Sequence, residues 1–482
     1  MQLLFALARW GVLVFAAWGL LAPVTAHAQP TVDRSVQPQV LALDAFQKRV
    51  LASHPELAQV RNEQAQARRL ITAAQGAFDP KLAASLAQKR FKDEPYYAVS
   101  DVGISVPTFV GADFKLGYER GVGTRVNPEN YTPSGGLLTL GVSIPLARDI
   151  ITDERRTGLA RARAISAIAD ADVVAQSNKL LLNATKAYAD WYLAYRKYVI
   201  ADSSLGLATF RLASVQARIA AGENPPIDSV EARLEVRKRQ VLILEAQNDQ
   251  LVAQLEAAAY LWGPSQLATQ ISITDVPVLP AIPINVGDTA AVAAWIADAA
   301  RSHPAVRKAN GKIALESAEW RLNAQGLLPD VDITLSSIAS GTAGPLVRPS
   351  QWESNYKAMA TGETSLLLRK ERGKMQASAL KVESARLERD LVQRRVTIEI
   401  RAALNALMMV ESAVQLQRDN VAAAGLLRDA EEVRFANGES TLLSVNLRER
   451  LLLDELVKLE QFNAKRISAG MLLTTARGIP VF

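Results

Sequence analysis

Apolar and polar residues alternate one by one in two windows of the chain. Over residues 331–336 every second position is apolar, and the residues between are Asp, Thr and Ser. Side chains of a strand point alternately to opposite faces, so strict alternation predicts half-buried strands. We expect strands over about 80–146 and about 330–368. The alternating apolar positions are Val102, Ile104, Val106, Phe114, Leu116, Tyr118, Leu138, Leu140, Val142, Ile144 and Leu146 in the first window and Val331, Ile333 and Leu335 in the second.

A spacing of three and four residues follows each window and predicts very long helices. Residues 150–222 contain no proline, and a helix of that extent would be about 110 Å long. A matching helix is expected at about 373–437. Apolar residues at this spacing form the seam of a coiled coil, so each long helix must lie along a partner. The seam positions are Tyr188, Trp191, Tyr195, Tyr198, Leu205, Ala208, Leu212, Val215 and Ile219 in the first helix and Ile400, Ala403, Leu407, Val410 and Val414 in the second.

Each long helix ends in a glycine-containing phrase, after which a second helix turns back. The phrases are RIAAGENPPIDSV from Arg218 and RFANGESTLLSV from Arg434. Gly222 and Gly438 suit the position just past a helix C-terminus, where the backbone is often left-handed. A return helix is expected over 226–262. Its predicted seam consists of Val230, Leu234, Val241, Leu244, Leu251, Leu255 and Trp262, interrupted by Arg237 and Asn248.

The two halves of the chain repeat each other. SHPEL at 53–57 returns as SHPAV at 302–306, and QGAFDPKL returns as QGLLPDV. The two histidines are as far apart as Pro80 and Pro329, so both matches lie in one register and indicate a duplication. Proline fits the first turn of a helix, which predicts helices over 55–78 and 304–327. The combined length of such a helix and a return helix nearly equals the length of one long helix. The two shorter helices could therefore stack end to end beside the long one, with the His-Pro phrase at the joint between them.

The N-terminus predicts export. An early arginine, an apolar centre and an Ala-His-Ala end are typical of a secretory signal peptide, with a membrane anchor as the alternative. The resulting segments are a signal peptide 1–28, an N-terminal tail 29–40, repeat one 41–262, a proline-rich linker 263–290, repeat two 291–478 and a C-terminal tail 479–482.

Composition narrows the function. There is no cysteine, which excludes a disulfide framework or a zinc–thiolate site. The net charge of +6 comes from 55 basic and 49 acidic residues spread along the chain, a pattern typical of solvated helix faces and not of a nucleic-acid site. After the signal, only His54 and His303 remain as histidines, both at repeat joints. We therefore expect no catalytic, cofactor or metal site, and no enzyme.

Strands of an exported chain cross a membrane only as a closed barrel. One chain offers roughly four to six strands, fewer than the eight of the smallest bacterial barrels, so several copies must share one. Here the sequence resembles the TolC family of outer-membrane efflux proteins over nearly the whole mature chain. The resemblance is carried by the duplicated helix–strand–strand–helix plan, the HPEL and HPAV phrases, the two helix-to-strand joints and the two Arg-x-x-x-Gly turns.

The resemblance implies a mainly α-helical fold with a membrane β part. A homotrimer would share one β-barrel in the outer-membrane lipid of a Gram-negative bacterium, continued by a coiled-coil α-helical tunnel in the periplasm. It also implies the exit duct of a tripartite efflux or type I secretion system, which docks to a periplasmic adaptor (membrane fusion) protein and an inner-membrane transporter. The adaptor-docking tip would contain Arg218, Gly222, Glu223, Arg434, Gly438 and Glu439.

The sequence departs from the family pattern in two places. Where well-studied members narrow the pore with aspartates past the second turn, this chain has Ser444 and Leu447, which leaves Asp228 as the pore-narrowing candidate. Repeat one also carries extra strand-like sequence over 97–121, which either enters the barrel or caps it. The alternative function is a secreted periplasmic coiled-coil scaffold or adaptor without a barrel.

Overall fold

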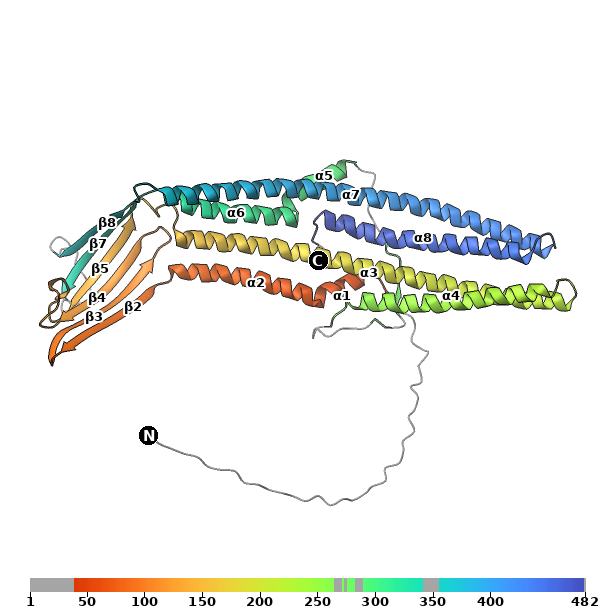
Figure 1. Ribbon diagram of the computed structural model, residues 1–482, viewed down its shortest axis with the longest axis horizontal. Helices are drawn as coiled ribbons and strands as arrows, with labels where there is room; N and C mark the ends of the chain where they lie inside the picture. The colour runs from red at the N-terminus through yellow and green to blue at the C-terminus, as the bar shows by residue number, and fades with distance from the viewer. Residues whose placement is uncertain (1–38, 264–270, 273–274, 282–288, 341–354, 481–482) are drawn as a thin grey trace, which may run out of the picture. The chain divides into compact units, whose positions relative to one another are not determined.

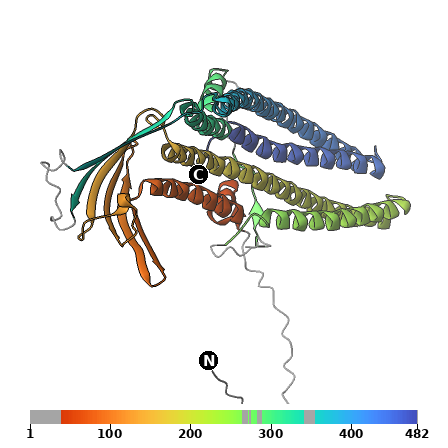
Figure 2. The same ribbon diagram turned by 60° about the vertical axis from the view of Figure 1, so that its left-hand side comes forward.

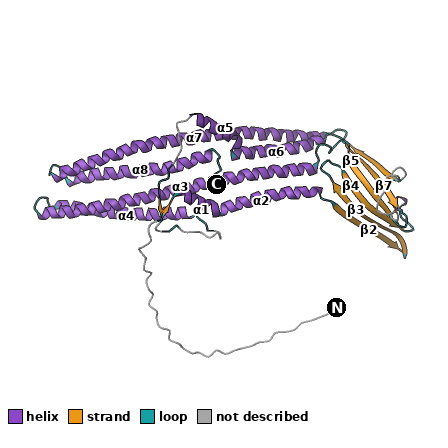
Figure 3. Ribbon diagram, turned by 180° about the vertical axis from the view of Figure 1, so that it is seen from behind, coloured by secondary structure: helices purple, strands orange, loops and turns teal. Residues whose placement is uncertain are grey.

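The long helices and the long strands occupy separate parts of the molecule (Figure 3). The computed structural model describes residues 39–263, 271–272, 275–281, 289–340 and 355–480. The predicted signal peptide, nearly all of the N-terminal tail and much of the linker therefore lie outside the described residues. Residues 39–482 form one compact unit.

Two long helices run through the unit, α3 (Glu154–Ala220) and α7 (Arg369–Ala436). Both confirm the predicted helices, with starts shifted by a few residues. The shift in α3 has a local cause, because the side chain of Asp153 accepts a hydrogen bond from the backbone N–H of Arg156 at 2.7 Å. This cap satisfies a donor that the first turn would otherwise leave unpaired. Among the described residues, none of the helices combines the length and the apolar character needed to span a membrane.

The shorter helices pack along the long ones, as Figure 1 shows. α3 contacts α2 (Pro55–Gln75), α4 (Ile227–Ala258), α6 (Pro304–Gln325) and α8 (Leu442–Ala476), whereas α7 contacts α6 and α8. The helices thus form four columns in the order α2 with α4, α3, α6 with α8, and α7. The end-to-end stacking of two shorter helices beside each long one is confirmed. Two further helices, α1 (Leu43–Ser53) and α5 (Thr289–Ser302), precede the His-Pro phrases.

The His-Pro phrases lie at the joints between stacked helices. The Nδ1 atoms of His54 and His303 accept hydrogen bonds from the backbone N–H groups of Glu56 and Ala305, at 3.3 and 3.2 Å. The His54 ring also lies 6.1 Å from the rings of Tyr260 and Trp262, just past the end of α4. At the other joint, a Cβ atom on Gly478 would lie 2.4 Å from His303 Cδ2. Each histidine therefore caps one helix and fits against the end of another.

The buried seams of the long helices agree with the predicted ones. Tyr188 and Trp191 of α3 are fully buried beside Phe46 and Val50 of α1. The α7 seam packs against α5, α6 and α8 through Ile400, Ala403 and Leu407, with Val306 and Leu473 among the neighbours. Val414, further along the same seam, is buried as well. These two clusters fix the middle of the rod, where the stacked helices meet.

The seam predicted for the return helix faces the wrong way for contacts within the chain. Its valines and leucines are 50–64% exposed, namely Val230, Leu234, Val241, Leu244, Leu251 and Leu255. The face of α4 that is buried instead consists of Ala232, Glu235, Val236, Arg239, Ala246, Ala253, Gln254 and Ala257. Small alanines allow α4 to approach α3 closely, so the larger side chains remain as an uncovered apolar stripe, called here the α4 stripe.

Six long strands of the described residues form one antiparallel sheet, and Figure 2 shows them side by side. Their order is β2-β3-β4-β5-β7-β8. The strands are β2 (Lys81–Phe91), β3 (Glu94–Pro107), β4 (Asp113–Val122), β5 (Leu137–Pro145), β7 (Asp330–Ser340) and β8 (Tyr356–Glu363). In the described residues, repeat two has two of these strands and repeat one has four, so repeat one has two strands more than the duplicated helix–strand–strand–helix plan. The extra segment 97–121 lies within the sheet as β3 and β4. A separate parallel pair joins β1 (Val40–Leu41) to β6 (Val276–Pro277).

The register gives the sheet two different faces. Leu82, Ile104, Leu116 and Leu140 lie opposite one another on adjacent strands and share one face. The alternate positions form the other face, where Lys81, Ser105, Lys115, Gly141, Ser336 and Lys357 follow one another across all six strands. One face is therefore apolar and the other polar, as the alternation predicted.

Candidate functional site

The two turns predicted to form the docking tip lie at the end of the helices remote from the sheet (Figure 1). Gly222 and Gly438 have φ angles of +80° and +81°, in the left-handed region. Behind them the N–H groups of Glu223 and Glu439 donate to the carbonyl oxygens of Arg218 and Arg434, both at 2.9 Å. This is the Schellman arrangement, in which glycine reverses the chain and satisfies the last carbonyls of the helix. Both glycines are therefore C′ residues, as the sequence predicted.

The tip residues differ in their surroundings. The Arg218 guanidinium lies 5.4 Å from the centre of the Phe435 ring, so it links the two turns through a cation–π contact. Arg434 forms an ion pair of 3.7 Å with Glu431. Glu223 and Glu439 are exposed. No atom lies within 4 Å of a Cβ built at Gly222 or Gly438, so both glycines face open space.

A small apolar cluster holds the turns beside each other. Val215 of α3, Ala232 of α4 and Leu442 of α8 are buried together, with Leu212, Ile219 and Phe435 against them. Three of these positions belong to the predicted α3 seam. The two turns therefore form one structural unit within the chain.

Asp228 lies in the first turn of α4 and is half-buried. Its Oδ2 accepts a hydrogen bond from Asn224 Nδ2 at 2.8 Å, and a carboxylate near a helix N-terminus is favourable. In the second turn, the backbone N–H of Ser444 donates to the cap residue Thr441, and Leu447 is exposed. The acidic group thus has a local structural partner in this chain.

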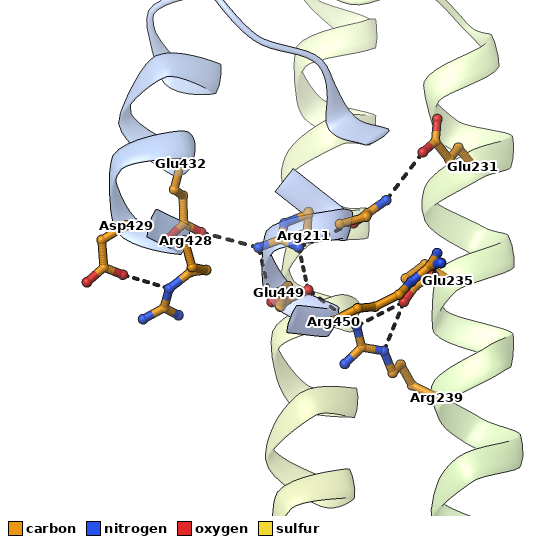
Figure 4. A network of polar contacts seen from close by, with 10 residues as sticks. Arg211, Glu231, Glu235, Arg239, Arg428, Asp429, Glu432, Glu449 and Arg450 are labelled. Carbon is orange, nitrogen blue, oxygen red and sulfur yellow. Dashed lines mark hydrogen bonds and ion pairs between the residues drawn. The ribbon is translucent and has the colours of Figure 1, made fainter. Parts of the chain in front are cut away.

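A network of charged side chains joins four helices behind the tip (Figure 4). We define it by Arg211 of α3, Glu235 and Arg239 of α4, Glu432 of α7, and Glu449 and Arg450 of α8. Arg211 Nη1 donates to Glu449 Oε2 at 2.7 Å, and Arg450 Nη2 donates to Glu235 Oε2 at 3.0 Å. Arg239 donates to Glu235 at 3.0 Å through Nε and lies 3.6 Å from Glu449. Arg211 also reaches Glu432 of α7 at 3.3 Å.

This ion-pair network is largely withdrawn from water. Glu449, Arg239 and Glu235 are only 1%, 3% and 5% exposed. Burial would raise the pKa of Glu235, but hydrogen bonds from Arg239 and Arg450 outweigh it and lower that pKa. Removing one member of a buried ion pair leaves the other charge uncompensated. The network therefore couples the α3–α4 hairpin to the α7–α8 hairpin.

Sequence reasoning missed this network. It took the larger apolar residues of α4 as the buried seam and interpreted the charged residues of the chain in general as solvated helix faces. A signal was present, because Glu235 and Arg239 are four residues apart, the spacing of a helical ion pair. The spacing does not distinguish a buried pair from an exposed one, since that depends on which face α3 and α8 cover.

The comparisons with known proteins bear on the fold. No protein-family model matches the sequence, and neither does any curated protein. Among solved structures, the outer membrane protein VceC of Vibrio cholerae is 16% identical with a TM-score of 0.61, over 90% of this chain and 96% of that chain. The outer membrane channel CmeC of Campylobacter jejuni is 12% identical with a TM-score of 0.61, over 90% and 85%. The outer membrane channel MtrE of Neisseria gonorrhoeae is 13% identical with a TM-score of 0.61, over 90% and 88%.

These similarities extend over both the helices and the sheet, because they cover nine-tenths of the chain. They confirm, at the level of the fold, the resemblance to the TolC family that the sequence indicated. The chain has the fold of these outer-membrane channels.

Proposed function

We propose that this protein is the outer-membrane exit duct of an efflux or secretion system and is not an enzyme. In this proposal three copies place their sheets together in the outer membrane of a Gram-negative bacterium. Their helices extend into the periplasm, where the tip meets an adaptor protein and an inner-membrane transporter. The duct conducts passively what the transporter delivers.

The observation that carries the proposal is the two-faced sheet at one end of the helices. Its apolar face includes Leu82 and Leu86 of β2, which are 73% and 79% exposed. A lipid-facing band beside a polar interior is the pattern of membrane barrels. In water the same face would be an aggregation hazard, so it favours a membrane location over the alternative of a soluble periplasmic scaffold.

The sheet has two edges that need partners. Within the described strands, β2 and β8 each pair on one side only. Unpaired strand edges are not tolerated in lipid. β2 leads away from the helices and β8 leads back to them, so β8 of a second copy would run antiparallel to β2. Copies arranged head to tail in this way form a ring.

The helices have matching edges. α4, in the column that ends at β2, carries the α4 stripe. α7, which follows β8, carries Leu426 and Val433 at 72% and 61% exposure in the half near the tip, where the α4 stripe lies. In the half near the sheet it carries Leu380, Leu387, Leu391 and Ile398 at 54–70% exposure. One head-to-tail contact would therefore cover the open strands and both apolar stripes. The number of copies, three, rests on the family resemblance.

Membrane fractionation followed by a native mass measurement of the detergent-extracted protein tests the proposal. We expect the protein in the outer-membrane fraction with the mass of three chains, and ion conduction after insertion into a planar bilayer. A water-soluble protein in the periplasmic fraction would support the scaffold alternative. A stable monomer in the membrane would contradict the shared barrel.

A further inference from the structure

We infer that the hairpin of β3 and β4 is an insertion in the barrel wall, so that three copies close an eighteen-stranded barrel instead of a twelve-stranded one. This inference rests on the proposed function. It concerns the number of strands that each chain adds to the barrel wall, which the duplication alone would set at four.

The duplication identifies which strands are additional. β2 follows α2 just past Pro80, and β7 follows α6 just past Pro329. β5 precedes the long helix α3, as β8 precedes the long helix α7. β2 and β5 are therefore the counterparts of β7 and β8. The segment Glu94–Val122, which contains β3 and β4, has no counterpart among the described residues of repeat two.

The additional hairpin lies in the plane of the sheet. β3 pairs with β2 from Ser105 opposite Lys81 to Glu94 opposite Phe91. On its other side it pairs with β4 over the whole of β4. β4 then pairs with β5 from Asp113 opposite Ser143 to Glu119 opposite Leu137. A hairpin that capped the barrel would leave β2 paired with β5, whereas here it separates them.

Both faces of the sheet continue across the hairpin. Val102, Ile104, Phe114 and Leu116 are 42–50% exposed and lie in the apolar face. Asp101, Lys115 and Glu119 lie in the polar face. A plug inside the lumen would turn such an apolar face toward water. A segment of wall turns it toward lipid, so the side-chain pattern fits the wall.

Glycines on the polar face show which side is concave. Gly103 lies opposite Gly117, which lies opposite Thr139. A Cβ atom on Gly117 would lie 2.7 Å from Thr139 Oγ1, and one on Gly141 would lie 2.3 Å from Ser336 Oγ. Glycines at such positions allow a sheet to bend. The polar face is thus the crowded inner side of the curve, and the hairpin shares it.

The dimensions of the two parts agree with this strand number. Eighteen strands spaced ~4.8 Å apart and tilted ~40° enclose a barrel about 36 Å wide between backbones, and twelve enclose one about 24 Å wide. Three copies of four helix columns make a ring of twelve helices, about 34 Å wide at an interaxial distance of ~9 Å. The diameter of the eighteen-stranded barrel is close to that of the helical ring, so the duct does not narrow where the helices meet the sheet.

Two neighbouring residues of β4 give a matched test. The chain contains no cysteine, so Lys115→Cys and Leu116→Cys each carry a single thiol, one on each face. In trimers inserted in a planar bilayer, a water-soluble, positively charged thiol reagent should change the current of Lys115→Cys in discrete steps and leave Leu116→Cys unchanged. A lipid-soluble maleimide should label Leu116→Cys. Reaction of both residues with the water-soluble reagent would overturn the inference, as would reaction of neither.

A strand count completes the test. Electron cryomicroscopy of the unmodified trimer in lipid should show eighteen strands, and a variant lacking residues 94–122 should show twelve and about half the cross-section. A twelve-stranded wall in the unmodified protein would overturn the inference while leaving the exit duct intact. Failure to find any trimer or any current would instead reject the proposed function. If the deletion variant does not fold, the cysteine pair still decides.

Discussion

Single residues determine where the long helices end. At Gly222 and Gly438 a left-handed backbone and two hydrogen bonds reverse the chain. Because open space surrounds both positions, a side chain there would project outward from the tip without disturbing the chain itself. These two positions can therefore separate a role in docking from a role in folding.

We expect Gly438→Trp to abolish export while leaving the trimer intact. A residue with a Cβ at this φ costs roughly 1–2 kcal/mol, which a large assembly tolerates, but the indole would occupy the space that an adaptor must approach. Trimer yield and export with the cognate pump are the measurements. Gly438→Asn is the matched control, because asparagine accepts the left-handed region and is small. Export by the tryptophan variant at the level of the asparagine variant would contradict docking at this turn.

The two joint histidines should make the protein less stable in mild acid. Burial lowers the pKa of His54 and of His303 below the ordinary value of 6.5. At pH values between the lowered pKa and 6.5, the unfolded chain binds more protons than the folded chain. The stability that the neutral histidines contribute is therefore fully present above pH 6.5 and is lost as the pH falls through this range. We expect the melting temperature to fall between about pH 7.5 and about pH 5.5.

The double variant His54→Asn, His303→Asn identifies the source of that pH dependence. Asparagine is an effective helix cap and does not titrate in this range. The variant should unfold with a weaker dependence on pH over the same interval. An unchanged dependence would assign the effect to other groups.

Between elements, the ion-pair network is the main polar link of the two tip hairpins. Glu449→Gln would leave Arg211 and Arg239 without their shared counter-charge, and breaking a buried pair typically costs about 3–5 kcal/mol. We expect a lower melting temperature and, because the hairpins can separate, a larger current through the reconstituted channel. Glu383→Gln is the control, since Glu383 pairs with Arg386 at the surface with more than half of each side chain exposed. Equal effects of the two substitutions would show that the network does not restrain the tip.

The sequence predicted elements better than it predicted their contacts. The extents of α3 and α7 followed from spacing and from the absence of proline, because propensity and period act locally. The buried face of α4 did not follow. A heptad pattern of Val and Leu identifies an apolar stripe but not the surface that covers it. Here the alanine-rich face of α4 packs against α3, and the α4 stripe is left uncovered within the chain. The tip glycines were predictable because a left-handed turn leaves few other residues to choose from.

At the scale of the whole molecule, both the sheet and the helical layer have two open edges. The sheet ends in β2 and β8, and the helical layer ends in the α2–α4 column and in α7. Each outer column is covalently continuous with the edge strand on its own side. In the proposed ring, a single head-to-tail contact would satisfy backbone groups in the sheet and apolar side chains in the helices, so both features support one assembly.

Two charge substitutions should separate assembly from folding. Val215 is 1% exposed among residues of its own chain, so Val215→Asp buries an unpaired charge at a cost of several kcal/mol and should reduce the amount of folded protein. Leu244 is 64% exposed in the single chain. Leu244→Asp should therefore leave the chain folded, as measured by circular dichroism, but prevent the ring, as measured by native mass. Lys465→Asp, at an exposed position of α8 in the column between α3 and α7, is the control and should assemble normally. A Leu244→Asp protein with the trimer content of the control would mean that the α4 stripe is not the surface that meets the next copy.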